Sequence, residues 1–329
     1  MVEMRRPSRR GLMLGAAVIG AGAARAQTGG FTPTRAVSLV VSNPAGGTND
    51  FTARLLSEPL SRRLGVPVVV ENRPGGNGVV GTQYAARAKP DGYTLYVPYS
   101  GTVTGIPAVR GTAEIDPQRD FAPVALLIEA PQVMMVHPSV PVNTLPEFIA
   151  YAKARPGQLA YASSGTGSAQ HLGTELLKNR AGIDLLHVPY RGTGETVADF
   201  LVGRVQFYMT TPPPVISAIR DGKLRPLAMA SPQRHPSLPD VPTTAEAGLA
   251  DYSAEAWFGL MAPAATPPEI IARFAQEAQA VLADPVVASR ALEAGAFARF
   301  EDPATFKARV ERDTARWTEL VKVAGIKPD

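Results

Sequence analysis

The sequence contains no cysteine among its 329 residues. This absence excludes disulfides, thiolate metal sites, cysteine nucleophiles and a lipid-anchored N-terminal cysteine. Histidine is almost as scarce. The four histidines are His137, His171, His187 and His235, and none lies within five residues of another, so the local spacing of a histidine metal site is also lacking. We therefore expect a protein that needs no metal and no cofactor.

Excess charge is lacking outside the first 26 residues. The formal net charge is +4, and residues 1–26 account for it with five arginines and one glutamate. The balanced remainder has no long-range attraction for a polyanion, so we expect no nucleic-acid partner. Hydrophobic residues make up 45% of the chain and charged residues 19%. That composition is typical of globular proteins, and the length suits about two domains.

Nucleotide-binding motifs are incomplete. Gly76–Gly81 (GNGVVG) is a literal G-x-G-x-x-G after a predicted strand. A dinucleotide-binding fold also places an acidic residue at the end of the next strand, which here ends without one in residues 96–99. The G-x-x-x-x-G-K-[ST] pattern is absent as well. A nucleotide ligand therefore has little support.

Residues 1–26 are predicted to be an export signal. Four arginines precede an uncharged stretch of fourteen residues, Gly11–Ala24, and Ala24-Arg25-Ala26 forms a small-x-small cleavage site. The stretch is too short to span a bilayer, which takes about 20 residues. Ser8–Met13 (SRRGLM) resembles a twin-arginine signal, which we favour over the general secretion route although Leu12 stands where phenylalanine is usual. We expect a mature protein that is soluble in the periplasm.

Short apolar runs alternate with helical patterns along the rest of the chain, which predicts an α/β architecture with parallel sheets. Strands are expected at 37–42, 66–71, 93–98, 121–129, 133–137, 159–163, 185–189, 205–210, 224–230 and 257–262. Helices are expected at 144–154, 169–180, 268–283, 286–294 and 303–324, among others.

The order of these elements predicts two lobes. The pattern restarts after Ala130-Pro131, and the last three helices follow only one strand, so we expect them to pack on the first lobe. Lobe 1 would hold residues 27–129 and 249–329, and lobe 2 residues 130–248. The hinge would lie near 127–132 and within 230–257. Ligands of open α/β sheets bind beyond the carboxyl ends of the strands, so one cleft between the lobes is the expected site.

Two glycine-rich loops lie at such strand ends, Asn43–Asn49 (NPAGGTN) and Ser164–Ser168 (SGTGS), and each leads into a helix. Glycines let main-chain N–H groups approach a ligand, and a helix N-terminus attracts an anion. We expect the two loops to face each other and clamp a dicarboxylate, with one carboxylate held by each lobe. The competing interpretation is that their polar residues are ordinary N-caps that need no ligand. These residues are Thr48, Asn49, Asp50, Ser164 and Ser168.

Catalytic constellations are weak. Ser164 or Ser168 could form a nucleophile pair with His171, but the G-x-S-x-G motif of a nucleophile elbow is missing, so we do not expect an enzyme. We expect His171 to support the loop instead. Arg191 follows a predicted strand with Tyr190 and has two open roles, pairing a ligand carboxylate or pairing Glu195. Trp257 and Phe258 are expected to pack in the core or hinge.

Seven segments in this order resemble one family, the Bug (Bordetella uptake gene) or TctC-like substrate-binding proteins of tripartite tricarboxylate transporters. They are PAGG with Asp50 and Arg54 (44–54), ENRPGG (71–76), PDGYTL (90–95), YASSG with Ser168 and His171 (161–172), HVPYRG (187–192), LPDVPT (238–243) and WFGL (257–260). The resemblance implies a type II periplasmic-binding-protein fold, a Venus flytrap that closes on small carboxylates or related compounds. Members are similar in holding the ligand through backbone amides, hydroxyls and bridging waters.

The resemblance and the loops together point to a set of ligand-binding positions. They are Ala45, Gly46, Gly47, Thr48, Asn49, Asp50, Ser100, Gly101, Thr102, Ser164, Gly165, Thr166, Gly167, Ser168, Tyr190, Arg191 and Gly192. The expected function is capture of a small organic anion by a monomeric periplasmic solute-binding protein that delivers it to membrane transporter components. A ligand-sensing subunit for a signalling partner such as a sensor kinase, and a periplasmic hydrolase, remain as alternatives. The identity of the ligand stays open.

Overall fold

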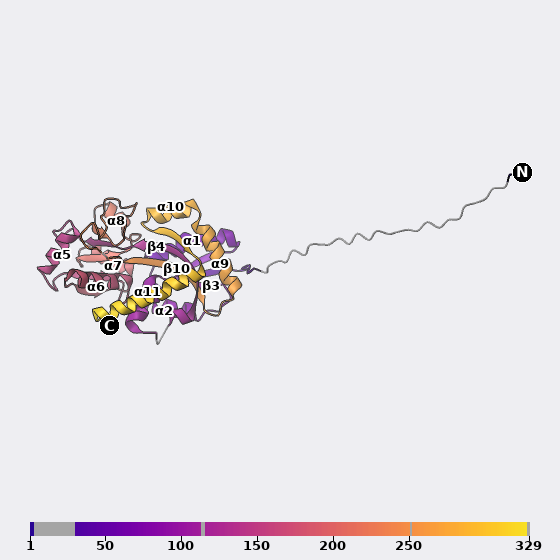
Figure 1. Cartoon of the computed structure of the whole chain (residues 1–329), viewed down its shortest axis with the longest axis horizontal. Coiled ribbons are helices and arrows are strands. Elements are labelled where there is room, and N and C mark those ends of the chain that lie inside the picture. Colours follow the sequence, from indigo (N-terminus) through magenta and orange to yellow (C-terminus); the bar gives the residue numbers. More distant parts are fainter. Residues whose placement is uncertain (3–29, 113–115, 251, 328–329) are drawn as a thin grey trace. The chain divides into compact units, whose positions relative to one another are not determined.

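The computed structural model describes residues 1–2, 30–112, 116–250 and 252–327. The chain divides into two units after Gly30, and the account below concerns the body that begins at Phe31 (Figure 1). The predicted export signal lies outside the described residues except for Met1 and Val2. Within the described ranges, no helix combines the length and the apolar character that a membrane crossing requires.

One half of the body is a six-stranded mixed sheet in the order β11-β4-β10-β3-β1-β2. Strand β1 pairs in parallel with β2 and β3, whereas β10 runs antiparallel to β3 and β4, and β11 antiparallel to β4. The strands are β1 (Val37–Val41), β2 (Val68–Asn72), β3 (Thr94–Tyr96), β4 (Phe121–Pro131), β10 (Glu255–Pro263) and β11 (Phe297–Glu301).

Helices cover both faces of this sheet because side chains alternate along its strands. Val37, Leu39 and Val41 of β1 belong to one apolar cluster and Val40 to another on the opposite face. Helices α1 (Thr48–Leu64), α9 (Pro268–Leu282) and α10 (Pro285–Glu293) contribute to the first cluster. The second cluster includes residues of α2 (Val79–Ala86), the π-helical turn η2 (Gly101–Gly105) and α11 (Pro303–Ala324). Three short helices, η1 (Gly76–Gly78), α3 (Ile106–Arg110) and α4 (Pro117–Asp120), lie in the connections.

The other half is a five-stranded sheet in the order β7-β6-β8-β5-β9. Strand β6 is parallel to β7 and β8, and β5 is antiparallel to β8 and β9. The strands are β5 (Val133–Val136), β6 (Ala160–Ser163), β7 (Leu186–Pro189), β8 (Phe207–Thr210) and β9 (Arg225–Met229). Helices α5 (Leu145–Lys153) and α6 (Ala169–Ala181) share one core cluster, and α7 (Thr193–Leu201) and α8 (Ile216–Arg220) share the cluster on the other face.

The two halves are joined where Gln132 connects β4 to β5. The Gln132 main chain donates its N–H to Ala254 O (3.0 Å) and accepts from Ala230 N–H (2.8 Å), so the outgoing and returning segments meet there. Helix α11 adds a third link, because Trp317 and Val321 pack with Leu172 of α6 and Val109 of α3. In Figure 1, α11 extends from the six-stranded half to the side of α6.

The two-lobed α/β fold expected from the sequence is confirmed. The expectation of parallel sheets is confirmed for β1 with β2 and β3 and for β6 with β7 and β8. It is wrong for β4, β5 and β10, which run antiparallel to their neighbours. Strand β11 was not predicted from the sequence. The expected helices at 169–180, 268–283 and 303–324 agree with α6, α9 and α11 to within one residue at each end.

Candidate functional site

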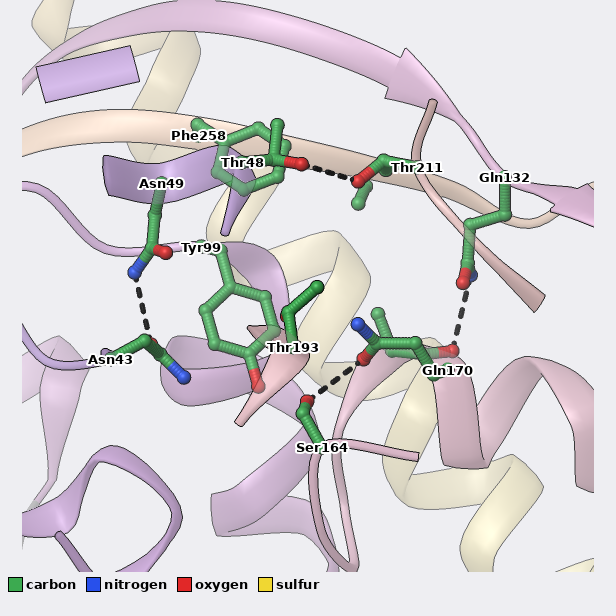
Figure 2. Close-up of a pocket in the computed structure, with 12 residues that line it drawn as sticks. Asn43, Thr48, Asn49, Tyr99, Gln132, Ser164, Gln170, Thr193, Thr211 and Phe258 are labelled. Carbon is green, nitrogen blue, oxygen red and sulfur yellow. Dashed lines mark hydrogen bonds between the residues drawn. The ribbon is translucent and has the colours of Figure 1, made fainter. Parts of the chain in front are cut away.

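A polar pocket lies between the two sheets (Figure 2). Its volume is about 20 Å³, enough for roughly one water molecule. No charged side chain is among its lining residues. They are Asn43, Thr48, Asn49, Tyr99, Gln132, Ser164, Ala169, Gln170, Thr193, Thr211, Ala256 and Phe258. Most of them follow the carboxyl end of a strand or begin the next helix, as the α/β architecture predicts.

The loop before α1 forms one wall of the pocket. The Thr48 hydroxyl bonds the Thr211 hydroxyl of the other half (2.7 Å), and Asn49 Nδ2 donates to Asn43 Oδ1 (2.9 Å) (Figure 2). The N-cap of α1 is Gly47 and makes no side-chain capping bond. The interpretation of Thr48, Asn49 and Asp50 as N-caps is therefore wrong, because all three lie inside the helix.

Asp50 supports this loop from behind and does not line the pocket. Its carboxylate accepts hydrogen bonds from Gly46 N–H (3.1 Å), Arg54 Nε (3.0 Å) and Asn72 Nδ2 (3.0 Å). Burial works to raise the pKa of Asp50, but these hydrogen bonds and the Arg54 charge outweigh it and hold the pKa below its ordinary value. The carboxylate therefore stays ionised and fixes the course of the glycine loop.

The loop before α6 forms the facing wall. Ser168 is the N-cap, as the competing interpretation of this loop holds, and its Oγ accepts from His171 N–H (3.2 Å). Three loop N–H groups are bonded within the loop or to α6: Gly165 N–H to Ser163 Oγ, Gly167 N–H to His171 Nδ1 and Ser168 N–H to Gly165 O. The Ser164 hydroxyl donates to Gln170 Oε1 (3.1 Å) in the pocket. A ligand at this wall would therefore rely on hydroxyls and on the remaining N–H groups.

The histidines near this loop are engaged in its support. His171 Nδ1 accepts the Gly167 N–H at 3.2 Å, in line with the role expected for it. The His171 and His187 rings stack with centroids 4.3 Å apart, and His187 Nε2 lies 2.7 Å from Ser163 Oγ. The loop before α6 is thus held in place by hydrogen bonds to Ser163, Ser168 and His171.

Ser100, Gly101 and Thr102 do not line the pocket, but Gly101 and Thr102 contact Tyr99, which lines it. Thr102 Oγ1 donates to Tyr99 O (2.9 Å), and a Cβ on Gly101 would stand 2.3 Å from the Tyr99 ring. The Tyr99 ring also stacks on Phe258, with centroids 6.4 Å apart. Burial raises the pKa of Tyr99, and the nearby Ser164 hydroxyl only partly offsets this. The Tyr99 hydroxyl is buried and has no hydrogen-bond partner among the described residues.

Tyr190 and Arg191 line a second, wider cavity of about 670 Å³, to which both glycine loops also contribute residues. There the Asn77 Nδ2 donates to Thr166 O (2.8 Å) and links the two halves. The Tyr190 hydroxyl donates to Asp199 (3.0 Å), and the Glu195 carboxylate accepts the main-chain N–H of Arg191 (3.3 Å). The cavity is lined by Pro44, Pro74, Gly75, Gly76, Asn77, Arg110, Gly165, Thr166, Pro189, Tyr190, Arg191 and Glu195.

Several pocket residues were not identified from the sequence. The sequence pattern could have identified Gln132, because it is a single polar residue between the apolar ends of β4 and β5. Thr211 follows β8 directly, and Phe258, expected only to pack, both packs on Tyr99 and lines the pocket. Asn43, Tyr99, Gln170 and Thr193 are neighbours of predicted positions. Trp257 packs on Phe306 in the core, as expected.

The comparisons with known proteins agree with this architecture. Residues 52–326 match the tripartite tricarboxylate transporter family receptor. The chain is 34% identical over 316 residues to Protein BugT of Bordetella pertussis, which covers 96% of this chain and 97% of that protein. The solved structure of R. palustris Rpa4515 with adipate is 36% identical, covers 90% of this chain and 99% of that one, and has a TM-score of 0.87. MatC from Rhodopseudomonas palustris with bound malate is 33% identical, covers 88% and 99%, and has a TM-score of 0.83.

These matches extend over most of the described body, and the solved structures have TM-scores of 0.87 and 0.83 with it. A polar pocket between two α/β sheets is the place where proteins of this fold hold a solute. The chain belongs to the tripartite tricarboxylate transporter receptor family of periplasmic solute-binding proteins, which includes the Bug proteins.

Proposed function

We propose that this protein captures a small organic acid between its two halves in the periplasm and delivers it to the membrane components of a tripartite tricarboxylate transporter, without chemical change. The observation that carries the proposal is the neutral polar pocket, whose walls come from both sheets. The adipate and malate held by Rpa4515 and MatC support a carboxylate as the ligand class.

Capture requires the two halves to separate. The pocket volume of about 20 Å³ is far smaller than an organic acid needs. Opening breaks the Thr48–Thr211 contact across the pocket and the Asn77–Thr166 contact at the wider cavity, both of which link the halves. We infer that residues 27–129 with 249–329 and residues 130–248 move as the two lobes, with hinges near 127–132 and within 230–257. Ligand binding would then shift an open–closed equilibrium.

Charge stabilisation in the pocket is assigned to dipoles, because its lining side chains are all uncharged. Helices α1 and α6 begin at opposite walls, and their first-turn N–H groups favour a carboxylate. We assign the direct contacts to Ala45–Asn49 and Ser164–Ser168. In this arrangement Gly101 and Thr102 act through Tyr99, and Asp50 acts by fixing the glycine loop. Tyr190 and Arg191 contribute at the wider cavity.

A thermal-shift screen tests the proposal. The panel would contain di- and tricarboxylates, hydroxy acids, amino acids, aromatic acids and nicotinamide. A ligand at 100 times its dissociation constant stabilises the protein by roughly 2.7 kcal/mol, which raises Tm by several degrees. Thr211→Val leaves the buried Thr48 hydroxyl unpaired across the pocket and should weaken binding about tenfold. Thr314→Val is the matched control and should bind normally, because the Thr314 hydroxyl bonds Val310 and Gln118 away from the pocket. A panel without any stabilising acid would overturn the proposal.

A further inference from the structure

Gln132 presents an unpaired acceptor to the pocket. The residue is 1% exposed and lines the pocket at the connection between the two halves (Figure 2). Its Oε1 atom is buried and has no hydrogen-bond partner among the described residues. A buried amide oxygen left without a donor costs roughly 1–3 kcal/mol, so an explanation is required.

The orientation of the Gln132 amide is fixed by its other atom. Nε2 donates to Ala169 O at 3.1 Å, and the main chain of Gln132 is held on both sides by Ala230 and Ala254. Rotating the amide by half a turn would place two oxygens against each other, because Ala169 O can only accept. Oε1 is therefore a fixed acceptor.

The other polar groups of the pocket do not supply the missing donor. Ser164 donates to Gln170 Oε1, the Thr48 and Thr211 hydroxyls bond each other, and Asn49 Nδ2 donates to Asn43. The Tyr99 hydroxyl also lacks a partner, but it points toward Ser164 in Figure 2. It can donate to a carboxylate oxygen, whereas Gln132 Oε1 can only accept.

We propose that Gln132 makes the pocket selective for organic acids that carry a hydrogen-bond donor, a hydroxyl, an amine or an amide N–H, over acids with only a hydrocarbon chain between their carboxylates. This inference rests on the proposed function and specifies its ligand class. A ligand donor placed at Oε1 satisfies the orphan acceptor. A plain alkyl diacid leaves Oε1 unpaired or places carboxylate oxygens near it.

The size of the preference follows from the type of site. A site built to hydrogen-bond a substrate group discriminates strongly against the analogue that lacks it, since the buried partner is left unsatisfied. We expect the best donor-bearing acid to bind at least tenfold tighter than its plain analogue. A hydroxyl, an amine and an amide N–H can each donate to Oε1, and the experiment below tests the three groups separately.

Titration calorimetry of the wild-type protein with matched acids tests the inference. Succinate is compared with malate and aspartate, which add a hydroxyl or an ammonium group, and with succinamate, in which an amide replaces one carboxylate. Adipate and its hydroxy, amino and amide analogues form the longer set. A tenfold or greater preference for one donor class supports the inference. Equal or tighter binding of the plain diacids in both sets overturns it and leaves the proposed function standing. If no acid binds, both fall.

Gln132→Met removes the acceptor at nearly constant volume, together with the Nε2 donor to Ala169 O. The variant should lose the preference for the donor-bearing acid while binding the plain analogue as well as before or better. An unchanged preference ratio would mean that a bound water satisfies Oε1, and the inference would be wrong. Gln206→Met, which removes an acceptor of the Ala160 N–H outside the pocket, is the matched control and should keep the wild-type ratio. If Gln132→Met does not fold, the wild-type comparison alone decides.

Discussion

His235 is a buried histidine at a second contact between the two halves. Its Nδ1 accepts the Ser237 N–H (3.1 Å), and its ring packs on Phe297 with centroids 4.5 Å apart. Its Nε2 is buried without a hydrogen-bond partner in the described part of the chain. Burial lowers the pKa of His235 to about 4. The neutral imidazole is thus part of the packing between the β9–β10 connection and β11.

This pKa predicts an acid-dependent loss of stability. An unfolded histidine has a pKa of about 6.5, so the unfolded state binds the proton first as the pH falls. The contribution of His235 is complete above pH 6.5 and is lost between about 6.5 and 4. Urea unfolding of wild type and His235→Asn at pH 7 and 5 measures it. Wild type should lose roughly 2 kcal/mol more than the variant over this interval. Parallel losses in both proteins would contradict the assignment.

Sequence patterns predict loops better than they predict pocket side chains. The glycine loop at 43–49 and the Ser168 cap follow from local chemistry, because strand ends, glycines and capping residues act over a few positions. Gln132 could not be assigned this way. Its role depends on Ala169, Ala230 and Ala254, which lie 37 or more positions away in the chain and meet it only in the folded body.

At the scale of elements, the two halves approach each other through glycine backbones. A Cβ on Gly105 at the end of η2 would lie 2.3 Å from Gly167 O in the loop before α6. A Cβ on Gly192 before α7 would lie 2.7 Å from Pro44 Cγ. Contacts this short are not tolerated, so the close approach of these elements requires glycine at both positions.

Gly105→Ala should therefore hold the halves apart. Moving the halves apart relieves the clash with Gly167, so the fold is retained while the apparent affinity for the acid falls at least tenfold. Gly194→Ala is the matched control, because its Cβ would lie 3.8 Å from Ala45 O, an ordinary contact across the same boundary. Calorimetric affinities and circular dichroism of both variants check this. Wild-type affinity in Gly105→Ala would refute the required approach.

The strands that were missed or given the wrong direction are those that pair with residues far away in the chain. Strand β11 has only five residues, and its place beside β4 depends on residues more than 160 positions away. The antiparallel direction of β4 and β10 follows from their crossing between the halves, where Glu255 pairs with Pro131. Apolar runs predict that these segments are strands, but they do not encode the partner or its direction.

At the scale of the whole molecule, the two connecting segments and helix α11 form three links that limit how the halves move. The segments around Gln132 and Ala254 are hydrogen-bonded together, and α11 joins the six-stranded half to α6 through Trp317 and Leu172. Trp257 Nε1 also donates to Asp313 of α11 (2.8 Å), which fixes that helix on β10. The order of apolar runs predicted a double connection. The coupling through α11 was not predicted, since it depends on side chains that meet only across the folded body.

A crystal structure of the protein with the tightest-binding acid of the panel tests the central claim most directly. We predict that the acid lies between Asn49 and Thr48 on one side and Ser164 and Gln170 on the other, with its donor group within hydrogen-bond distance of Gln132 Oε1. An acid bound outside this pocket, for example in the surface cavity lined by Arg35 and Tyr84, would contradict the account.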